Sequence, residues 1–170
     1  KVSGRAVLIT YLCDPKAIVA LAMTLGVDRV QLHGPIQLDE VRRLRRCAPH
    51  LGLIKSLVVR DDNLRDLATE ITVFSPYVEA FLTDTFDAAT GACGATGKTH
   101  DWGTSRILVE WSPRPVTLAG GLTAANVRDA IRYVRPAGVD VHTGIEGAEG
   151  RKDRSLAAAF VSEARRGWLE

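Results

Sequence analysis

Residues 116–146 read VTLAGGLTAANVRDAIRYVRPAGVDVHTGIE, and they contain two consecutive units of a strand, a glycine turn and a helix. The first four residues form an apolar run typical of a buried parallel strand, and this run ends at Gly120-Gly121. Thr123 then suits the N-cap of a helix over residues 124–134. The pattern indicates an α/β protein with a parallel sheet.

The second unit repeats this layout. Its strand covers residues 138–141, ends at Thr143-Gly144, and leads to a helix over residues 151–166. The two glycine turns are therefore expected side by side at the carboxyl ends of neighbouring strands. Backbone N–H groups at such turns, together with a helix N-terminus, form an anion site without any basic side chain.

Four earlier units of the same kind precede this stretch. Their strands are predicted over residues 6–12, 29–32, 53–59 and 80–83, and their helices over residues 15–25, 38–47, 61–69 and 101–110. The apolar residues 71–78 fit either the end of the third helix or a loop. Residues 86–99 form a long loop rich in glycine, alanine and threonine, which we interpret as an active-site cover because strong elements bound it on both sides.

The composition is that of one globular domain. The chain has 170 residues, of which 22 are basic and 20 acidic, so its net charge of +2 indicates neither a nucleic-acid nor a membrane surface. No apolar run approaches a membrane span and the first residues lack the layout of a secretion signal, so we expect a cytoplasmic protein. Cys13, Cys47 and Cys93 lack zinc-like spacing, which favours reduced thiols.

Five motifs occur along the chain in a recognisable order: VQLHG at 30–34, GATGKTHDW at 94–102, LAGGLTAANVRDAI at 118–131, GVDVHTGIE at 138–146 and GRKD at 150–153. Together they resemble the phosphoribosylanthranilate isomerase family of tryptophan biosynthesis, over nearly the whole chain from about residue 6. The resemblance implies a TIM (β/α)8 barrel, a small phosphorylated substrate, and neither cofactor nor metal.

The number of units is lower than this fold requires. A closed barrel has eight βα units, whereas the sequence predicts six. Comparison with the family implies that the first two units precede residue 6, so that residues 1–170 form a single, N-terminally incomplete barrel domain. A true fragment, or two chains that complete each other, would also fit. Six strands alone would leave two exposed parallel edges, which natural proteins rarely tolerate.

The reaction that the resemblance implies is an Amadori rearrangement of N-(5-phosphoribosyl)anthranilate. An acid protonates the ring oxygen of the sugar, and a base then removes the proton at C2, so two positioned proton-transfer groups are needed. The family's acid falls on Asp84 in FLTDT. An ionisable residue at the carboxyl end of a barrel strand also points to catalysis, although Asp84 would alternatively cap the following loop.

The family's base is a cysteine after the first strand, in a Lys-Ile-Cys-Gly motif that this chain does not contain. An arginine that usually follows the family's second strand is also absent, because the first two βα units of the family have no counterpart in the given residues. Cys13, after the first predicted strand, and Cys93, in the glycine-rich loop, are weak substitutes because a catalytic thiol also needs an electropositive setting. The resemblance therefore places the base upstream of the given residues.

Further residues are candidates for substrate binding. Gly120, Gly121, Thr143 and Gly144 are predicted to hold the phosphate, since the last two turns of a TIM barrel commonly do so. His33 corresponds to a family residue near the substrate, or alternatively it only bonds its own turn. Asp140 matches a residue near the anthranilate end, or it pairs with a basic side chain of the barrel.

Two departures from the family pattern bear on the substrate. His142 stands where the family usually has a small hydroxyl residue, and His100 stands where it usually has an aromatic one. An imidazole beside a phosphate adds a donor.

Three functions fit the sequence. The first reading is the isomerase, the second is a catalytically silent homologue that binds a phosphorylated metabolite, and a third is another phosphosugar enzyme on this barrel. The outer helix faces fit either a monomer or a homodimer.

Overall fold

The computed structural model describes residues 6–60, 62–87, 92–93 and 99–169. The elements follow one another as β1 (Leu8–Thr10), α1 (Pro15–Leu25), β2 (Arg29–Leu32), α2 (Leu38–Cys47), β3 (Gly52–Val59), α3 (Leu64–Phe74), β4 (Ala80–Asp87), β5 (Ala92–Cys93), α4 (Trp102–Trp111), β6 (Val116–Leu118), α5 (Val127–Val134), β7 (Gly138–Val139), the 3-10 helix η1 (Thr143–Ile145) and α6 (Arg154–Leu169).

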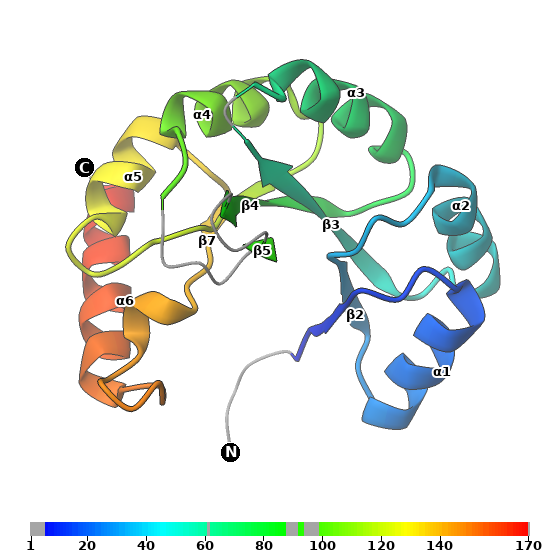
Figure 1. Cartoon of the computed structure of the whole chain (residues 1–170), viewed down its shortest axis with the longest axis horizontal. Coiled ribbons are helices and arrows are strands. Elements are labelled where there is room, and N and C mark those ends of the chain that lie inside the picture. Colours follow the sequence, from blue (N-terminus) through cyan, green and yellow to red (C-terminus); the bar gives the residue numbers. More distant parts are fainter. Residues whose placement is uncertain (1–5, 61, 88–91, 94–98, 170) are drawn as a thin grey trace.

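Six of the described strands form a parallel sheet in the order in which they occur along the chain, β1-β2-β3-β4-β6-β7, while the short β5 pairs antiparallel with β4. The helices form an arc outside the curved sheet (Figure 1). Consecutive order with all helices outside is the winding of a TIM barrel. The predicted fold class and the six βα units are confirmed, and among the described strands β1 and β7 are the two edges of an open sheet.

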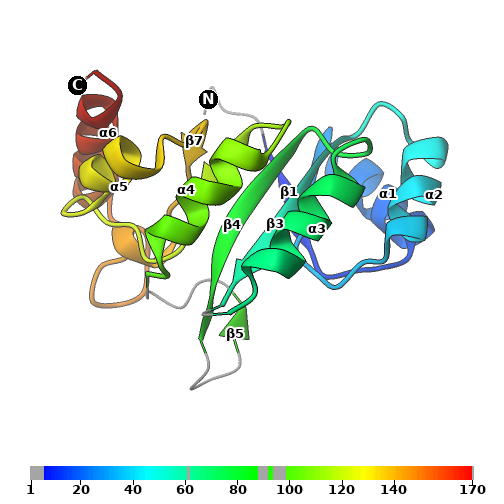
Figure 2. The ribbon, with the colours of Figure 1, turned by 90° about the horizontal axis from the view of Figure 1, so that it is seen from above.

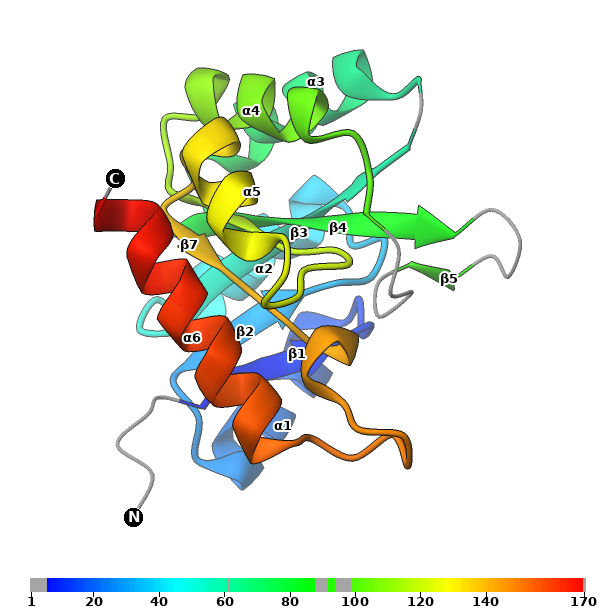
Figure 3. The same ribbon diagram turned by 90° about the vertical axis from the view of Figure 1, so that its left-hand side faces the viewer.

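Apolar side chains explain how the helices cover the sheet. One cluster includes Ile18, Leu57 and Phe81 and lies beneath α1 to α4, and a second cluster lies beneath α5 and α6. From above, α3 and α4 lie side by side along β3 and β4 (Figure 2). The adjoining view shows α5 and α6 packed together next to β7 (Figure 3). The core thus occupies the layer between sheet and helices, and the inner side of the curve is left for the site.

Helix starts follow from capping side chains. Asp14 accepts hydrogen bonds from the N–H groups of Lys16 and Ala17, so α1 begins where the sequence predicts. Asp101 accepts from the N–H groups of Gly103 and Thr104, so it caps α4, which begins one residue after its predicted start.

The start of α5 differs from the prediction. Thr123 does not cap it, because the Thr123 hydroxyl accepts from the N–H of Ala125 and the helix begins only after Asn126. Here a local turn precedes the helix and replaces its predicted first residues.

Other boundaries also moved. Strand β4 does not end at Asp84 but runs to Asp87, because β5 pairs with its last residues. Helix α3 continues to Phe74, which resolves the ambiguous stretch in favour of helix over its first part. β1 and β7 are shorter than predicted. Most of the predicted cover over residues 86–99, including residues 94–98, lies outside the described residues, as does the side chain of Cys93.

Candidate active site

A cavity of about 220 Å³ opens on the inner side of the sheet, where the carboxyl ends of its strands meet. It brings together most of the residues predicted to form the site, although they come from four separate βα units. Its lining consists of Ile9, Tyr11, Gln31, His33, Asp84, Ala119, Gly120, Gly121, Leu122, Asp140, Val141, His142 and Thr143.

Asp84 projects from β4 toward this cavity, with its side chain 13% exposed. Burial raises the pKa of its carboxyl, and the adjacent Asp140 raises it further. The N–H of Thr85, which donates to Oδ1 at 2.8 Å, opposes the shift, and so do the imidazoles of His33 and His142 when they are protonated. The balance favours the protonated form. A carboxyl with a raised pKa at this end of a barrel strand suits a general acid. The alternative role of Asp84 was to cap the following loop. Within the described residues, its only hydrogen bond to that segment is the one from the N–H of Thr85.

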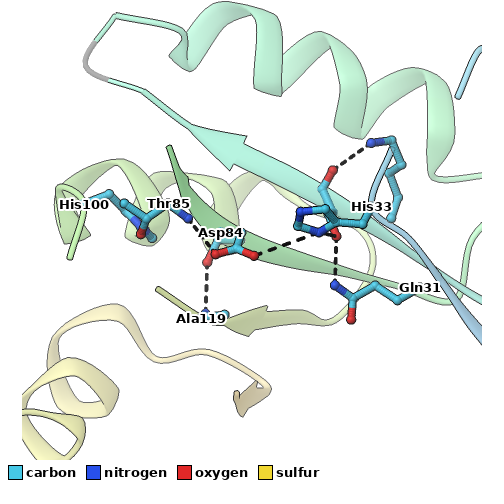
Figure 4. Close-up of polar contacts among 9 residues, drawn as sticks. Gln31, His33, Asp84, Thr85, His100 and Ala119 are labelled. Atoms are coloured by element: carbon cyan, nitrogen blue, oxygen red, sulfur yellow. Dashed lines mark hydrogen bonds and ion pairs between the residues drawn. The ribbon is translucent and has the colours of Figure 1, made fainter. Parts of the chain in front are cut away.

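His33, at the end of β2, lies directly opposite Asp84 (Figure 4). Its Nδ1 is 3.9 Å from Oδ2 of Asp84 and 3.1 Å from Oγ of Ser56, and the Tyr11 ring meets the imidazole edge-on at 4.7 Å between centroids. Gln31 donates from Nε2 to the same Ser56 oxygen at 3.0 Å. His33 thus belongs to a buried polar network beside the acid, which the sequence did not predict.

The first glycine turn is fixed by its neighbours. Gly120 has φ of +98°, and a Cβ there would overlap Oγ1 of Thr85, so only glycine fits. Asn126 braces the turn, since its Nδ2 donates to the carbonyl of Gly121 at 3.1 Å and its Oδ1 accepts from the N–H of Thr123 at 2.8 Å.

The second glycine turn packs on the first. A Cβ on Gly144 would overlap the carbonyl oxygen of Leu122, so the two turns touch through glycine. Within the described residues, the N–H groups of Gly120, Gly121, Thr143 and Gly144 donate no hydrogen bond to the protein. Unpaired amides gathered at adjacent turns are the arrangement that binds phosphate. Gly144 supports this arrangement from just behind the cavity lining.

Asp140 directly follows β7 and also lines the cavity, and burial raises the pKa of its carboxyl. It forms no ion pair with a described residue. Lys152 instead donates to Oε1 of Glu146 and to the carbonyl of His142, both at 2.7 Å, and Nδ1 of His142 is 3.3 Å from the same carboxylate oxygen. The alternative in which Asp140 pairs with a basic side chain therefore does not hold in this part of the molecule.

The two unusual histidines differ in position. His142 lines the cavity next to Thr143, whereas His100 lies half-buried behind Thr85 and is not among the residues that line this cavity. Nδ1 of His100 bonds to Oγ1 of Thr85 at 2.9 Å and Nε2 to Oγ of Ser105 at 2.6 Å, and burial lowers the pKa of this imidazole to about 4. Of the two histidines, His142 is the one that lines this cavity.

Neither Cys13 nor Cys47 is placed to supply a base at this cavity. Cys13 and Cys47 are exposed, and neither is among the residues that line the cavity. Among the described residues no group of three or more His, Cys, Asp and Glu side chains is arranged for a metal ion. None of the described helices is long and apolar enough to cross a membrane.

Comparison with known proteins identifies the family. The family model for N-(5'-phosphoribosyl)anthranilate isomerase matches residues 13–163. The chain belongs to the N-(5'-phosphoribosyl)anthranilate isomerase family. N-(5'-phosphoribosyl)anthranilate isomerase 2 of Methanosarcina mazei is 40% identical over 159 residues, which cover 94% of this chain and 69% of that protein. The enzyme of Halobacterium salinarum is 38% identical over 162 residues, covering 94% and 70% respectively.

Solved structures of the isomerase family agree. The phosphoribosyl anthranilate isomerase of Thermotoga maritima has a TM-score of 0.75 at 30% identity and covers 94% of this chain and 72% of its own. A phosphoribosyl anthranilate isomerase in complex with reduced 1-(o-carboxyphenylamino)-1-deoxyribulose 5-phosphate has a TM-score of 0.70 at 27% identity, covering 94% and 69%. The resemblance drawn from sequence motifs is thereby confirmed.

Proposed function

We propose that the chain catalyses the aldose–ketose isomerisation of N-(5'-phosphoribosyl)anthranilate in tryptophan biosynthesis. The observation that carries this proposal is the position of Asp84, a carboxyl with a raised pKa, in one cavity with two glycine turns whose amides are unpaired within the described chain. The isomerisation of a phosphorylated sugar requires an acid for proton transfer and an anion site for the phosphate. Family membership specifies which phosphorylated sugar.

In this mechanism Asp84 donates its proton to the ring oxygen of the ribose. The bond between C1 and that oxygen breaks, which leaves a protonated imine between C1 and the anthranilate nitrogen. A base then removes the proton from C2, and the resulting enol gains a proton at C1 and loses the proton of its C2 hydroxyl, which gives the ketone of the product. The raised pKa of Asp84 suits it to the first step, because general acids work best with a pKa near the working pH.

The substrate's two ends are held at different elements. The phosphate lies at the turns of Gly120-Gly121 and Thr143-Gly144, where backbone N–H groups supply the hydrogen bonds. Asp140 and His33 contact the sugar and anthranilate portion. The chemistry calls for no cofactor and no metal.

For the base we propose the thiol that the family resemblance implies, carried by a strand that pairs with β1. No described strand pairs with the outer edge of β1, and Ile9 and Tyr11 on that side line the cavity while being 58% and 63% exposed. A neighbouring strand would cover these side chains and bring its own end to the cavity. We place the enzyme in the cytoplasm as a monomer or a homodimer; one relative, from Thermotoga maritima, is described as dimeric.

A second reading is a silent homologue that binds a phosphorylated metabolite, and the lack of a thiol among the described lining residues favours it. Two measurements on the purified protein separate the readings: turnover of N-(5'-phosphoribosyl)anthranilate, and binding of reduced 1-(o-carboxyphenylamino)-1-deoxyribulose 5-phosphate. Turnover together with binding supports the isomerase. Binding without turnover supports the silent homologue. The absence of both turnover and binding would refute both readings.

A further inference from the structure

The Ser56 hydroxyl is the centre of the polar network beside Asp84. Ser56 lies on β3, is only 1% exposed, and has two partners among the described residues: Nε2 of Gln31 at 3.0 Å and Nδ1 of His33 at 3.1 Å. Both partners line the cavity, whereas Ser56 lies behind them. Figure 4 shows Gln31 and His33 beside each other and next to Asp84, and Nδ1 of His33 is the ring atom that faces both the hydroxyl and the carboxyl.

The positions of the protons follow from counting donors and acceptors. A serine hydroxyl carries one hydrogen and accepts through its lone pairs. The Gln31 amide nitrogen is a donor only, so Ser56 accepts from it. The hydroxyl hydrogen then has a single described acceptor within reach, the lone pair on Nδ1 of His33. A neutral imidazole that accepts at Nδ1 carries its proton on Nε2.

This tautomer matters because Nδ1 is also the ring atom nearest to the acid, 3.9 Å from Oδ2 of Asp84. A protonated imidazole there would stabilise the ionised carboxylate and lower the pKa of Asp84. A neutral imidazole with an unprotonated Nδ1 does not stabilise the carboxylate in this way. The other ionisable groups that act on Asp84 are Asp140, which favours its protonated form, and His142, which opposes it.

We propose that Ser56, oriented by Gln31, is a positioning residue that holds His33 as the neutral Nε2–H tautomer and so keeps Asp84 in its acid form. The proposal rests on the assignment of Asp84 as the acid, and it adds Ser56, which lies behind the cavity lining and acts through His33, and Gln31, which orients Ser56. It also means that His33 and Asp84 form no ion pair in the resting site, despite their proximity.

The first test reads the tautomer directly, without any turnover. Protein labelled with 15N-histidine is studied by NMR at pH 7, where the shifts of the two ring nitrogens show which one carries the proton. For His33 the expected result is a protonated Nε2 and an unprotonated Nδ1. A proton on Nδ1 would overturn the proposal, and it is the result expected if the Gln31 amide has the opposite orientation and reverses both bonds.

The second test uses Ser56→Ala, with Ser105→Ala as the matched control. Ser105 is also fully buried and bonded to a histidine, but its partner is His100. In Ser56→Ala the His33 ring nitrogens should change their shifts, and the alkaline limb of kcat should move down by about one pH unit, the size of effect that a nearby charge produces. Ser105→Ala should leave the His33 signals in place.

Gln31→Glu provides the reverse experiment. The carboxylate accepts where the amide donated, so Ser56 turns its hydrogen toward residue 31 and His33 must donate from Nδ1. The NMR signature should switch to a protonated Nδ1. An unchanged signature in both Ser56→Ala and Gln31→Glu would refute the role of the network. If the wild-type protein shows no turnover but the expected tautomer, the proposed function fails while the assignment of the protons stands.

Discussion

Burial acts in opposite directions on two side chains that are joined through Thr85. It raises the pKa of Asp84 and lowers that of His100, because in both cases it disfavours the charged form. The N–H of Thr85 donates to Asp84, and its hydroxyl bonds to His100. The acid with the raised pKa faces the cavity, and the imidazole with the lowered pKa lies behind it, bonded to the hydroxyls of Thr85 and Ser105.

The depressed pKa of His100 predicts how stability depends on pH. Between its ordinary value of 6.5 and its folded value of about 4, the unfolded chain binds a proton that the folded chain does not. Stability is therefore complete above pH 6.5 and falls as the pH drops toward 4, by at most about 3 kcal/mol from this residue. Urea unfolding at pH 7 and pH 5 measures the difference.

His100→Phe is the control, because the phenyl ring fills similar space and does not titrate. Its loss of stability between pH 7 and pH 5 should be smaller than that of the unaltered protein. Equal losses in the two proteins would show that His100 is already protonated, or not buried, in solution.

At this scale the sequence predicted the residues that carry charge but not those that orient them. Asp84, His33 and Asp140 line the cavity as expected. Ser56 and Asn126 were missed, because an uncharged side chain acquires its role only from neighbours far along the chain. One signal was present, since Ser56 and the preceding Lys55 interrupt an otherwise apolar buried strand, where a polar group needs a partner.

At the scale of elements, the two glycine turns act as one unit because they touch at Gly144. An alanine there would push its Cβ into the carbonyl of Leu122 and separate the turns. Gly144→Ala should therefore weaken the binding of inorganic phosphate and destabilise the fold by about 1–3 kcal/mol, the range for overpacked sites. Calorimetry of phosphate binding and thermal unfolding measure the two effects.

Gly26→Ala is the matched control, because Gly26 ends α1 at a φ of +64° and has open space around its Cβ position. It should lose stability through backbone strain alone, by about 1 kcal/mol, and leave phosphate binding unchanged. Phosphate affinity that survives in Gly144→Ala would contradict the assignment of the anion site to these turns.

Most elements were predictable because periodicity and capping agree. Helix α2 and strand β2 have the predicted bounds, and Asp14 and Asp101 mark helix starts. The start of α5 could not be predicted, since Thr123 and Asn126 are both good capping residues and the choice between them depends on bonds within the preceding turn. The length of β4 depends on pairing with β5, which local sequence does not reveal.

For the whole molecule, the sheet predicts a gradient of stability. β3 and β4 are eight residues long and have neighbours on both sides, whereas β1 and β7 contribute three and two residues at the described edges. Local opening is easiest where pairing is least. In a chain limited to residues 1–170, hydrogen exchange should therefore be slowest in the first parts of β3 and β4 and faster by orders of magnitude in β1 and β7, whereas the strand proposed to carry the base would protect β1 where it is present. Equal protection in β1 and β4 would show that β1 is covered by a partner strand.

The fold as a whole was the easiest property to predict. Six repeats of strand, turn and helix allow few arrangements, because parallel strands with right-handed helical connections wind in one direction. What the repeats do not determine is how tightly the sheet curves and which side chains meet across it. The contact between His33 and Asp84, from β2 and β4, belongs to that second class.

The account depends most directly on Asp84 as the acid. The decisive measurement is the turnover of N-(5'-phosphoribosyl)anthranilate by Asp84→Asn beside the unaltered protein, with Asp140→Asn as the comparison and binding of the reduced product analogue measured for all three. An amide cannot donate the required proton, so kcat should fall at least about a hundredfold in Asp84→Asn while analogue binding persists. Asp140→Asn should chiefly change KM. Turnover by Asp84→Asn equal to that of the unaltered protein would contradict the account.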